Sequence, residues 1–172
     1  MGDSAMAVVA IIVATIIMGI FPLMAMANQT DKTTNLTVQT ATTELVNKVR
    51  ATGKLSGNDY DNFISELSAT GNSYDASITV QIADGNLAKK EGNSSDKIYY
   101  NKYNTQVMEE IYGDNGLSRT MNLKEGDVIS VTVKNTNTTI AQQLRNFMYK
   151  VIGNSSSAIT AEASGMITTS GN

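Results

Sequence analysis

The sequence predicts an α+β chain, with a long N-terminal hydrophobic helix continuing into a domain whose antiparallel sheet packs against helices. Three observations support this prediction. Residues 5–27 contain no charged side chain. Apolar residues then recur at helical spacing as far as residue 49. Further along, residues 78–82 and 128–134 alternate apolar with polar side chains, as strands with one buried face do.

Residues 5–27 read AMAVVAIIVATIIMGIFPLMAMA. As a helix this run would be about 34 Å long, enough to cross a hydrocarbon core of about 30 Å. Pro22 lies near its end, where it would kink the helix rather than abolish it. Ala10 and Ala14 form a small-xxx-small pair that permits close helix packing, although alanine is also a common helix filler. Residues 1–4 are left as a short tail.

Residues 28–53 are predicted to extend the same helix as an amphipathic segment. No Gly or Pro interrupts residues 28–52, and Gly53 is a suitable stop. Val38, Ala41, Leu45 and Val49 recur three or four residues apart and form one apolar face. The intervening NQTDKTTNLT is rich in threonine, a poor helix former, so we expect a weak polar collar between the two halves.

Residues 54–172 are predicted to form an exported α+β domain. Ser56 or Asn58 can cap the first of its helices. Residues 117–123 and 128–134 are expected to pair as a hairpin across a turn at 125–127. The expected helices are 58–69, 104–112 and one opening at Asn137 or Thr138, and the expected strands are 78–82, 97–101, 117–123, 128–134 and 158–168.

The composition argues against most catalytic and ligand-binding chemistry. The chain contains no Cys, His or Trp, so thiolate and imidazole metal ligands are missing. A serine nucleophile would lack its usual histidine base, and no GxSxG motif occurs. The 13 basic residues are dispersed and the net charge is −3, which disfavours nucleic-acid binding. We expect neither an enzyme nor a cofactor or metal site.

Several polar clusters have an ordinary structural interpretation. Glu109-Glu110 is expected on a solvated helix face rather than as a catalytic pair. Residues 84–86 and 113–116 are expected to be turns, although their oxygens could bind calcium. Tyr99, Tyr100, Tyr103 and Tyr112 are expected to be half-buried, with a carbohydrate or partner surface as the alternative. Candidate glycosylation sequons begin at Asn28, Asn35, Asn93, Asn137 and Asn154.

The apolar run could also be a signal peptide. Ala25-Met26-Ala27 satisfies the small-x-small rule for cleavage before Asn28. However, no Lys or Arg precedes Lys32, and the run exceeds the roughly 7–15 apolar residues of a signal peptide. These features favour a retained helix over a discarded one.

The N-terminal half resembles the type IV pilin-like proteins of bacteria. The resemblance lies in Gly2-Asp3-Ser4, the uncharged helix with Pro22 near its end, the amphipathic continuation and the sheet downstream. Among these proteins, the chain is most similar in style to the pilins and pseudopilins of tight-adherence (Tad) systems. Prepilins of this family carry a basic leader and a Glu at the fifth mature residue, whereas only Met1 precedes Gly2 here and that position is Ala7. The resemblance implies a carboxylate partner for the N-terminal amine, and Asp3 is the candidate.

The resemblance also implies a function. The chain would be a structural subunit of an extracellular pilus-like filament, or a minor pseudopilin of its assembly system, polymerising through its hydrophobic helix. Its partners would be copies of itself or other pilins, and the membrane before assembly. The rival interpretation is a monomeric, membrane-anchored surface binding protein. The residues expected to mediate self-assembly are Val8, Ala10, Ile11, Ile12, Ala14, Ile16, Met18 and Pro22.

Overall fold

The computed structural model describes residues 2–83, 99–113, 116–139, 142–143, 146 and 159–171, with side chains from Ser4 onward. The chain divides into two compact units. The first comprises residues 1–34 and 138–158, and the second comprises residues 35–137 and 159–172. The predicted α+β class is confirmed, with one long apolar helix followed by antiparallel strands and shorter helices.

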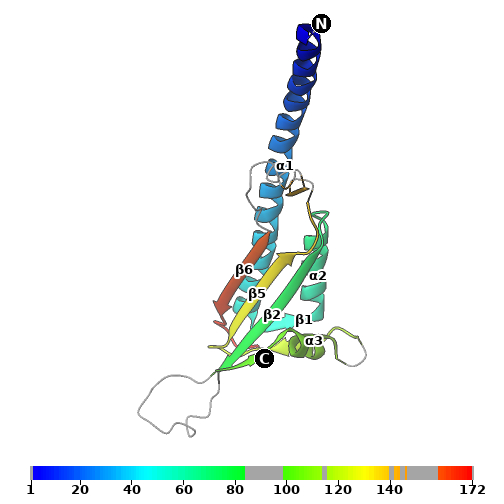
Figure 1. Cartoon of the computed structure of the whole chain (residues 1–172). Helices are drawn as coiled ribbons and strands as arrows, with labels where there is room; N and C mark the ends of the chain where they lie inside the picture. The colour runs from blue at the N-terminus through cyan, green and yellow to red at the C-terminus, as the bar shows by residue number, and fades with distance from the viewer. Residues whose placement is uncertain are drawn as a thin grey trace. The chain divides into compact units, whose positions relative to one another are not determined.

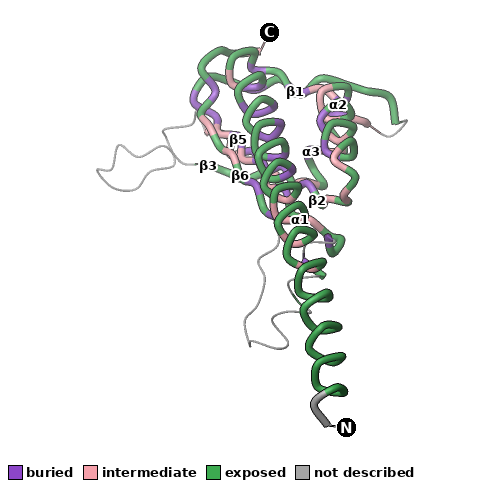
Figure 2. The backbone as a smooth tube through the Cα atoms, turned by 90° about the horizontal axis from the view of Figure 1, so that it is seen from above, coloured by how far each residue is buried: buried purple, intermediate pink, exposed green. Residues whose placement is uncertain are grey.

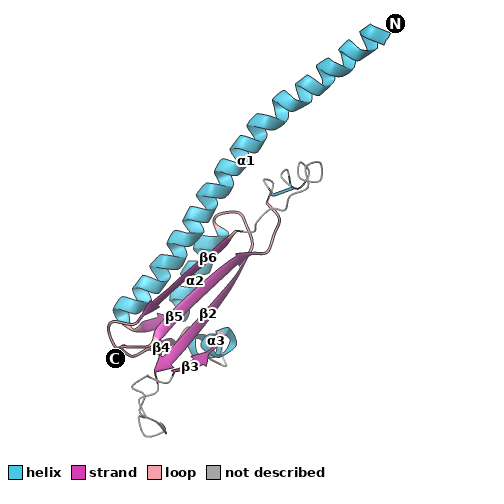
Figure 3. Cartoon of the chain, turned by 60° about the vertical axis from the view of Figure 1, so that its left-hand side comes forward, coloured by secondary structure: helices cyan, strands magenta, loops and turns pink. Residues whose placement is uncertain are grey.

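Helix α1 runs without interruption over Gly2–Thr52 (Figures 1 and 3). It passes through Pro22, as predicted, and through the threonine-rich stretch. There the hydroxyls of Thr30 and Thr33 each donate to the carbonyl four residues earlier, both at 3.1 Å. These local bonds satisfy the hydroxyls within the helix, so the polar collar is helical despite its low propensity.

Within the second unit, α1 buries the predicted apolar face. Val38, Ala41, Leu45 and Val49 are each at most 5% exposed. Figure 2 shows the alternation of buried and exposed backbone along this part of the helix. The helix ends at Thr52. The next residue, Gly53, has a φ of 65°, in the left-handed region, and its N–H donates to the Val49 carbonyl at 2.8 Å. Both features match the predicted stop.

The main sheet of the second unit has four antiparallel strands in the order β3-β2-β5-β6. Ile78, Val131 and Ala163 lie opposite one another in register on the face that packs against the helices. Ser77, Thr132 and Glu162 form the neighbouring row on the other face. The strands are β2 (Tyr74–Ala83), β3 (Tyr99–Lys102), β5 (Val128–Asn135) and β6 (Thr160–Met166) (Figure 1).

The predicted hairpin between residues 117–123 and 128–134 is wrong. The first segment contains only the short strand β4 (Thr120–Asn122), which pairs with β1 (Lys54–Ser56) in a separate two-stranded sheet. This pairing places Leu55 opposite Met121, and both side chains are at most 1% exposed. Burial of two large apolar side chains therefore outweighs the local pairing that the turn at 125–127 would have allowed.

The turn itself forms where it was predicted and is fixed by a buried carboxylate. Gly126 has a φ of 96°, and Asp127 is 2% exposed. The Asp127 carboxylate accepts the Lys124 N–H at 2.8 Å and the Ala83 N–H at 3.0 Å. Two backbone donors thus satisfy the buried carboxyl oxygens and join the turn to the end of β2.

Two short helices, α2 (Gly57–Ser68) and α3 (Asn104–Tyr112), complete the core of the second unit. Ser56 caps α2 as predicted. Its hydroxyl accepts the Asp59 N–H at 3.2 Å, and the Asp59 carboxylate accepts the Ser56 N–H at 3.2 Å. This reciprocal capping box satisfies two donors that the first turn of a helix otherwise leaves unpaired.

The C-terminal tail, residues 167–171, packs against the C-terminal end of α1. Thr168 donates both its N–H and its hydroxyl to the Arg50 carbonyl at 3.0 Å, and the Gly171 N–H donates to the Leu123 carbonyl at 2.9 Å. A Cβ at Gly53 would lie 2.2 Å from the Thr169 carbonyl oxygen. Glycine is therefore required here both for its backbone conformation and for this close approach.

Candidate functional site

The most unusual surface of the chain is the apolar part of α1. From Ser4 to Gly19 every residue is exposed. The large apolar residues between positions 20 and 26 are exposed or only partly buried. Met18 is 81% exposed and Ile12 is 53% exposed. A helix that is apolar on all sides is normally buried in a protein core or a membrane. The large exposed apolar residues are Met6, Val8, Val9, Ile11, Ile12, Val13, Ile16, Ile17, Met18, Phe21, Leu23 and Met26.

Among the described residues, α1 is the one helix long and apolar enough to cross a membrane. None of its most apolar window is buried within the chain, which distinguishes it from the core helix of a soluble protein. Its polar groups also suit an apolar environment. The hydroxyl of Thr15 donates to the Ile11 carbonyl at 2.8 Å, so it needs no external partner. The helix is therefore consistent with insertion into a membrane.

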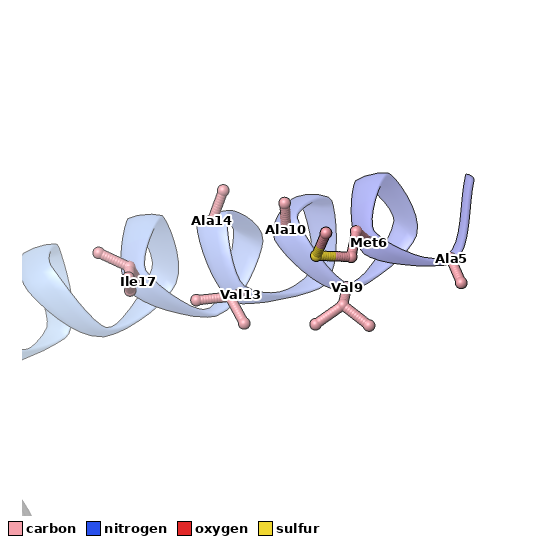
Figure 4. A pocket seen from close by; sticks show the side chains of 7 residues that line it. All are labelled: Ala5, Met6, Val9, Ala10, Val13, Ala14 and Ile17. Atoms are coloured by element: carbon pink, nitrogen blue, oxygen red, sulfur yellow. The ribbon is translucent and has the colours of Figure 1, made fainter. Parts of the chain in front are cut away.

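One side of this helix is hollowed into a shallow apolar groove. Its lining comprises three alanines and four larger apolar side chains: Ala5, Met6, Val9, Ala10, Val13, Ala14 and Ile17. Ala10 and Ala14 point to the same side of the helix (Figure 4). We call this surface the Ala10 groove. Small side chains such as Ala10 and Ala14 are typical of sites where helices pack closely.

The sequence-predicted assembly residues divide between the groove and the rest of the helix. Ala10 and Ala14 line the groove. The larger members, Val8, Ile11, Ile12, Ile16 and Met18, do not line it but are all exposed, as is Pro22. The side chain of Asp3, the candidate partner of the N-terminal amine, lies outside the described part of the chain. The groove lining at Met6, Val9, Val13 and Ile17 was not singled out from the sequence, because every side of the run is apolar.

The first unit also contains a polar contact just beyond the apolar run. The Thr139 hydroxyl donates to the Asp31 carboxylate at 3.2 Å and accepts the Gln142 N–H at 3.1 Å. The Gln142 side chain in turn accepts the Thr139 N–H at 3.2 Å, which completes a capping box. The sequence predicted a helix that opens at Asn137 or Thr138. The capping residue is instead Thr139, so that prediction is wrong by one or two residues. Its predicted apolar face lies outside the described residues.

No protein-family model, curated protein or solved structure matches this chain.

The acidic pair considered from the sequence lies on a solvated face of a helix. Glu109 and Glu110 are exposed on α3, as predicted, and Glu110 pairs with Lys102 at 2.6 Å. Within the described ranges no group of three or more acidic side chains could hold a metal ion. Residues 84–86 and 114–115, the other calcium candidates, lie outside those ranges.

The prediction for the tyrosines was mostly wrong. Tyr99, Tyr100 and Tyr103 are 38%, 51% and 61% exposed, on or next to the edge strand β3. Only Tyr112 is half-buried, between α2 and α3. The reason is that β3 lies at the edge of the sheet, so its side chains have neighbours on one side only.

Tyr112 has a structural role. Its hydroxyl donates to the Asp61 carboxylate, the Gly57 carbonyl lies 3.3 Å from the same oxygen, and the Tyr112 ring packs against that of Tyr60 in an edge-to-face arrangement. Burial, together with the Asp61 acceptor, raises the pKa of Tyr112 far above its usual range. Hydrogen bonding to a carboxylate holds the phenol protonated, so it serves as a fixed donor between α2 and α3.

The ion pair between α1 and α2 is also structural. Lys48 contacts Asp59 at 2.5 Å beside a shallow cleft between the two helices. Burial raises the pKa of Asp59, but hydrogen bonds from Lys48 and Ser56 outweigh that effect and leave the pKa below its ordinary value. The charged form of Asp59 is therefore the one that the fold stabilises.

Three of the five sequons lie in the described part of the chain. Asn35 is exposed on α1, and Asn28 is partly buried there. Asn137 is also exposed, but its side chain accepts the Ser73 N–H at 3.0 Å and donates to Asn72 at 3.2 Å. The other two, Asn93 and Asn154, lie outside the described residues.

Proposed function

We propose that this chain is a structural subunit of an extracellular pilus-like filament, or a minor subunit of its assembly system. The observation that supports this most is the apolar part of α1, which the chain leaves uncovered. Water contact is costly for such a helix, because burial of each Val, Leu, Ile or Met side chain is worth about 1.5–3 kcal/mol. Only a membrane or other apolar helices can cover it.

A subunit of a filament would have the apolar part of α1 covered first by the membrane and then by the helices of other subunits. Before assembly the helix lies in lipid, where α1 satisfies its own backbone. During assembly it exchanges lipid for the apolar helices of neighbouring copies, so its surface stays out of water throughout. The second unit, with its polar sheet face and exposed loops, would then face the medium. Copies of this chain or related subunits are the partners in this proposal.

The exposed tyrosines favour a second candidate. Tyr99, Tyr100 and Tyr103 are accessible on or next to the edge strand of the sheet. Aromatic side chains with a polar tip are frequent in surfaces that bind partners. A monomeric surface protein that α1 anchors permanently in the membrane would expose such side chains. This candidate predicts no polymer, which separates it from the first.

Substitution of Ile12 tests the filament proposal. Asp at this position would place a charge among apolar neighbours, and we expect filaments to be lost while the second unit remains folded. Thr40→Asp, on an exposed position of α1 in the second unit, is the matched control and should assemble normally.

Because a charge can also impair membrane insertion, Ile12→Ala is measured in parallel. It keeps the helix apolar but removes part of the contact surface, so the chain should reach the membrane and assemble less. Filaments of normal number and length from Ile12→Asp would contradict the proposal.

A further inference from the structure

The main sheet of the second unit ends in two edge strands, β3 and β6 (Figure 3). In an antiparallel edge strand, every second residue directs its backbone N–H and C=O away from the sheet. The Asn135 N–H donates to the Ile159 carbonyl at 2.9 Å, and the register carries this alternation into β6. Ala161, Ala163 and Gly165 therefore bond to β5, whereas the residues between them face outward.

The outward edge of β6 is open at Thr160, Glu162 and Ser164. Their outward backbone groups have no hydrogen-bond partner among the described residues, whereas the next outward residue, Met166, accepts the Arg50 Nε–H at 3.0 Å. Proteins usually protect an edge with a proline, a lysine, a bulge or a covering element. β6 pairs with β5 over seven residues without a bulge, and Glu162 is its one charged side chain. This edge is therefore suited to pairing with another strand.

The other edge of the sheet, β3, is open in a matching way. The Asn104 side chain accepts the Ile78 N–H at 3.0 Å, so the even-numbered residues of β2 face the β3 side. In the register of the two strands, they lie opposite the even-numbered residues of β3. The odd-numbered residues of β3, Tyr99 and Asn101, therefore direct their backbone groups away from the sheet.

The two edges match when one copy is placed beside another in the same orientation. All neighbouring strands are antiparallel, so with four strands β6 runs opposite to β3. The β3 of the second copy would therefore lie antiparallel to the β6 of the first. Outward residues on both edges, such as Ser164 and Asn101, also carry their side chains on the same face of the sheet. An odd number of strands would fail both conditions.

A join between two equal edges does not suit copies in one membrane. A two-fold axis between two β6 strands would run perpendicular to the sheet. It would reverse the direction of residues 35–52 of α1, which pack on that sheet, from one copy to the other. Copies that enter a membrane alike have these helices in the same direction. The strand that a second copy offers to the open edge is therefore β3.

We propose that β6 of one copy pairs with β3 of the next, so that the main sheet continues from subunit to subunit. This pairing rests on the proposed function in one respect, that neighbouring copies share one orientation. Because two different edges meet, the contact is heterologous and can repeat from copy to copy. The register that covers exposed apolar side chains places Met166, 53% exposed, opposite Tyr99, 38% exposed, and Ser164 opposite Asn101.

The contact depends on α1 for its strength. β3 has four residues, so the paired segment is short, and isolated strand pairs are marginal in water. In a membrane or filament, α1 would hold the copies together and raise their local concentration, which makes a weak contact effective. We therefore expect the pairing in assembled chains and not between copies dispersed in detergent micelles.

Mixed cysteine variants test the pairing, because the chain has no cysteine of its own. Cells co-express the full chain as Met166→Cys and as Tyr99→Cys, and the sheared surface material is oxidised. Opposed residues of paired strands have Cα atoms about 4.5–5.5 Å apart, which suits a disulfide. We expect at least about tenfold more disulfide dimer from the mixture than from either variant alone. Ser164→Cys with Asn101→Cys is a second pair, and Ser77→Cys with Tyr99→Cys is the control on a central strand.

The control should cross-link about tenfold less than the two edge pairs, because Ser77 lies on the same face of the sheet but away from the join. Dimers at either edge pair in excess of the control would support the proposal. No dimer at both edge pairs, or equal dimer from the control, would overturn it.

Proline on β6 gives a second measurement. Ser164→Pro removes an N–H that points away from β5, and an edge strand tolerates proline in that position. Added to the Met166→Cys chain, it should lower the disulfide yield with Tyr99→Cys about fivefold or more. Thr160→Pro, on the same edge but beyond the four residues of β3, is the matched control and should leave the yield unchanged. Urea unfolding checks that both variants fold, and equal yields from folded variants would contradict the pairing.

Micrographs of the same material separate the failure of this pairing from the failure of the proposed function. Filaments that form without the edge disulfides would refute the continued sheet and leave the filament proposal intact. Edge disulfides in the membrane fraction of cells that never form filaments would refute the proposed function and leave the pairing intact.

Discussion

Replacement of Gly53 by alanine is expected to destabilise the second unit strongly. Two independent effects add at this position. Gly53 has a φ of 65°, a conformation that costs an L-residue about 1–2 kcal/mol. An added Cβ would also lie 2.2 Å from the Thr169 carbonyl oxygen and 2.3 Å from the Gly171 nitrogen, so backbone must move. Overpacking of this kind costs about 1–3 kcal/mol, which gives a loss of about 2–5 kcal/mol in total.

Gly71 provides a matched control. Its φ of 77° also lies in the left-handed region, but a Cβ there would meet nothing within 4 Å. Gly71→Ala should therefore lose only about 1–2 kcal/mol, the conformational part alone. The difference between the two variants measures the close approach of the C-terminal tail to the end of α1.

Urea unfolding of the full chain in detergent micelles measures both losses. Near-ultraviolet circular dichroism follows the tyrosines, so the signal does not depend on the helicity of the apolar part of α1. Equal losses for Gly53→Ala and Gly71→Ala would refute the packing of the tail against Gly53. A stabilised Gly53→Ala variant would refute the backbone conformation as well.

Three further predictions concern the second unit. Ser56→Ala should cost about 1 kcal/mol of unfolding free energy, because α2 loses its capping box. Ile78→Ala, at a fully buried position, should cost about 2–5 kcal/mol, whereas the exposed Leu117→Ala should change stability by less than about 0.5 kcal/mol; both are measured by urea unfolding. Because the folded pKa of Asp59 lies below 3.8, its stabilisation is complete above that pH and is lost as the pH falls through the lowered pKa. Asp59→Asn should therefore reduce the acid dependence of unfolding, and an unchanged dependence would contradict this.

Elements with a strong local pattern could be predicted from the sequence. The stripe from Val38 to Val49 required a helix with one buried face, and the structure confirms it. Helix α3 has the predicted bounds, and α2 differs by one residue at each end. The alternation in residues 158–168 predicted β6, with Ala161 buried. In each case the side-chain period and the capping residues are local in sequence, so no long-range information was needed.

Pairing between distant strands could not be predicted in this way. The partner of β4 is β1, which lies far earlier in the chain, and the choice depends on the joint burial of Leu55 and Met121. The adjacent turn favoured the wrong partner. The same limitation applies to Tyr99, Tyr100 and Tyr103, because their exposure follows from the edge position of β3 in the sheet order. Sequence patterns give the period of an element but not its neighbours.

The apolar run was only partly interpretable from its sequence. Its length and lack of charge predicted a helix that needs an apolar environment. They did not identify a preferred side, because apolar residues occupy every side of it. The Ala10 groove depends on the three-dimensional arrangement of the helix, in which larger side chains flank Ala10 and Ala14.

We propose that α1 holds copies of this chain together outside the cell. Electron microscopy of material sheared from the surface of expressing cells, with immunogold labelling of the second unit, gives the decisive test. We expect labelled helical filaments in the sheared fraction, and their loss in cells that express Ile12→Asp. Chain found only in the membrane fraction, with no labelled filament in the sheared material, would contradict the claim and favour a permanently anchored monomer.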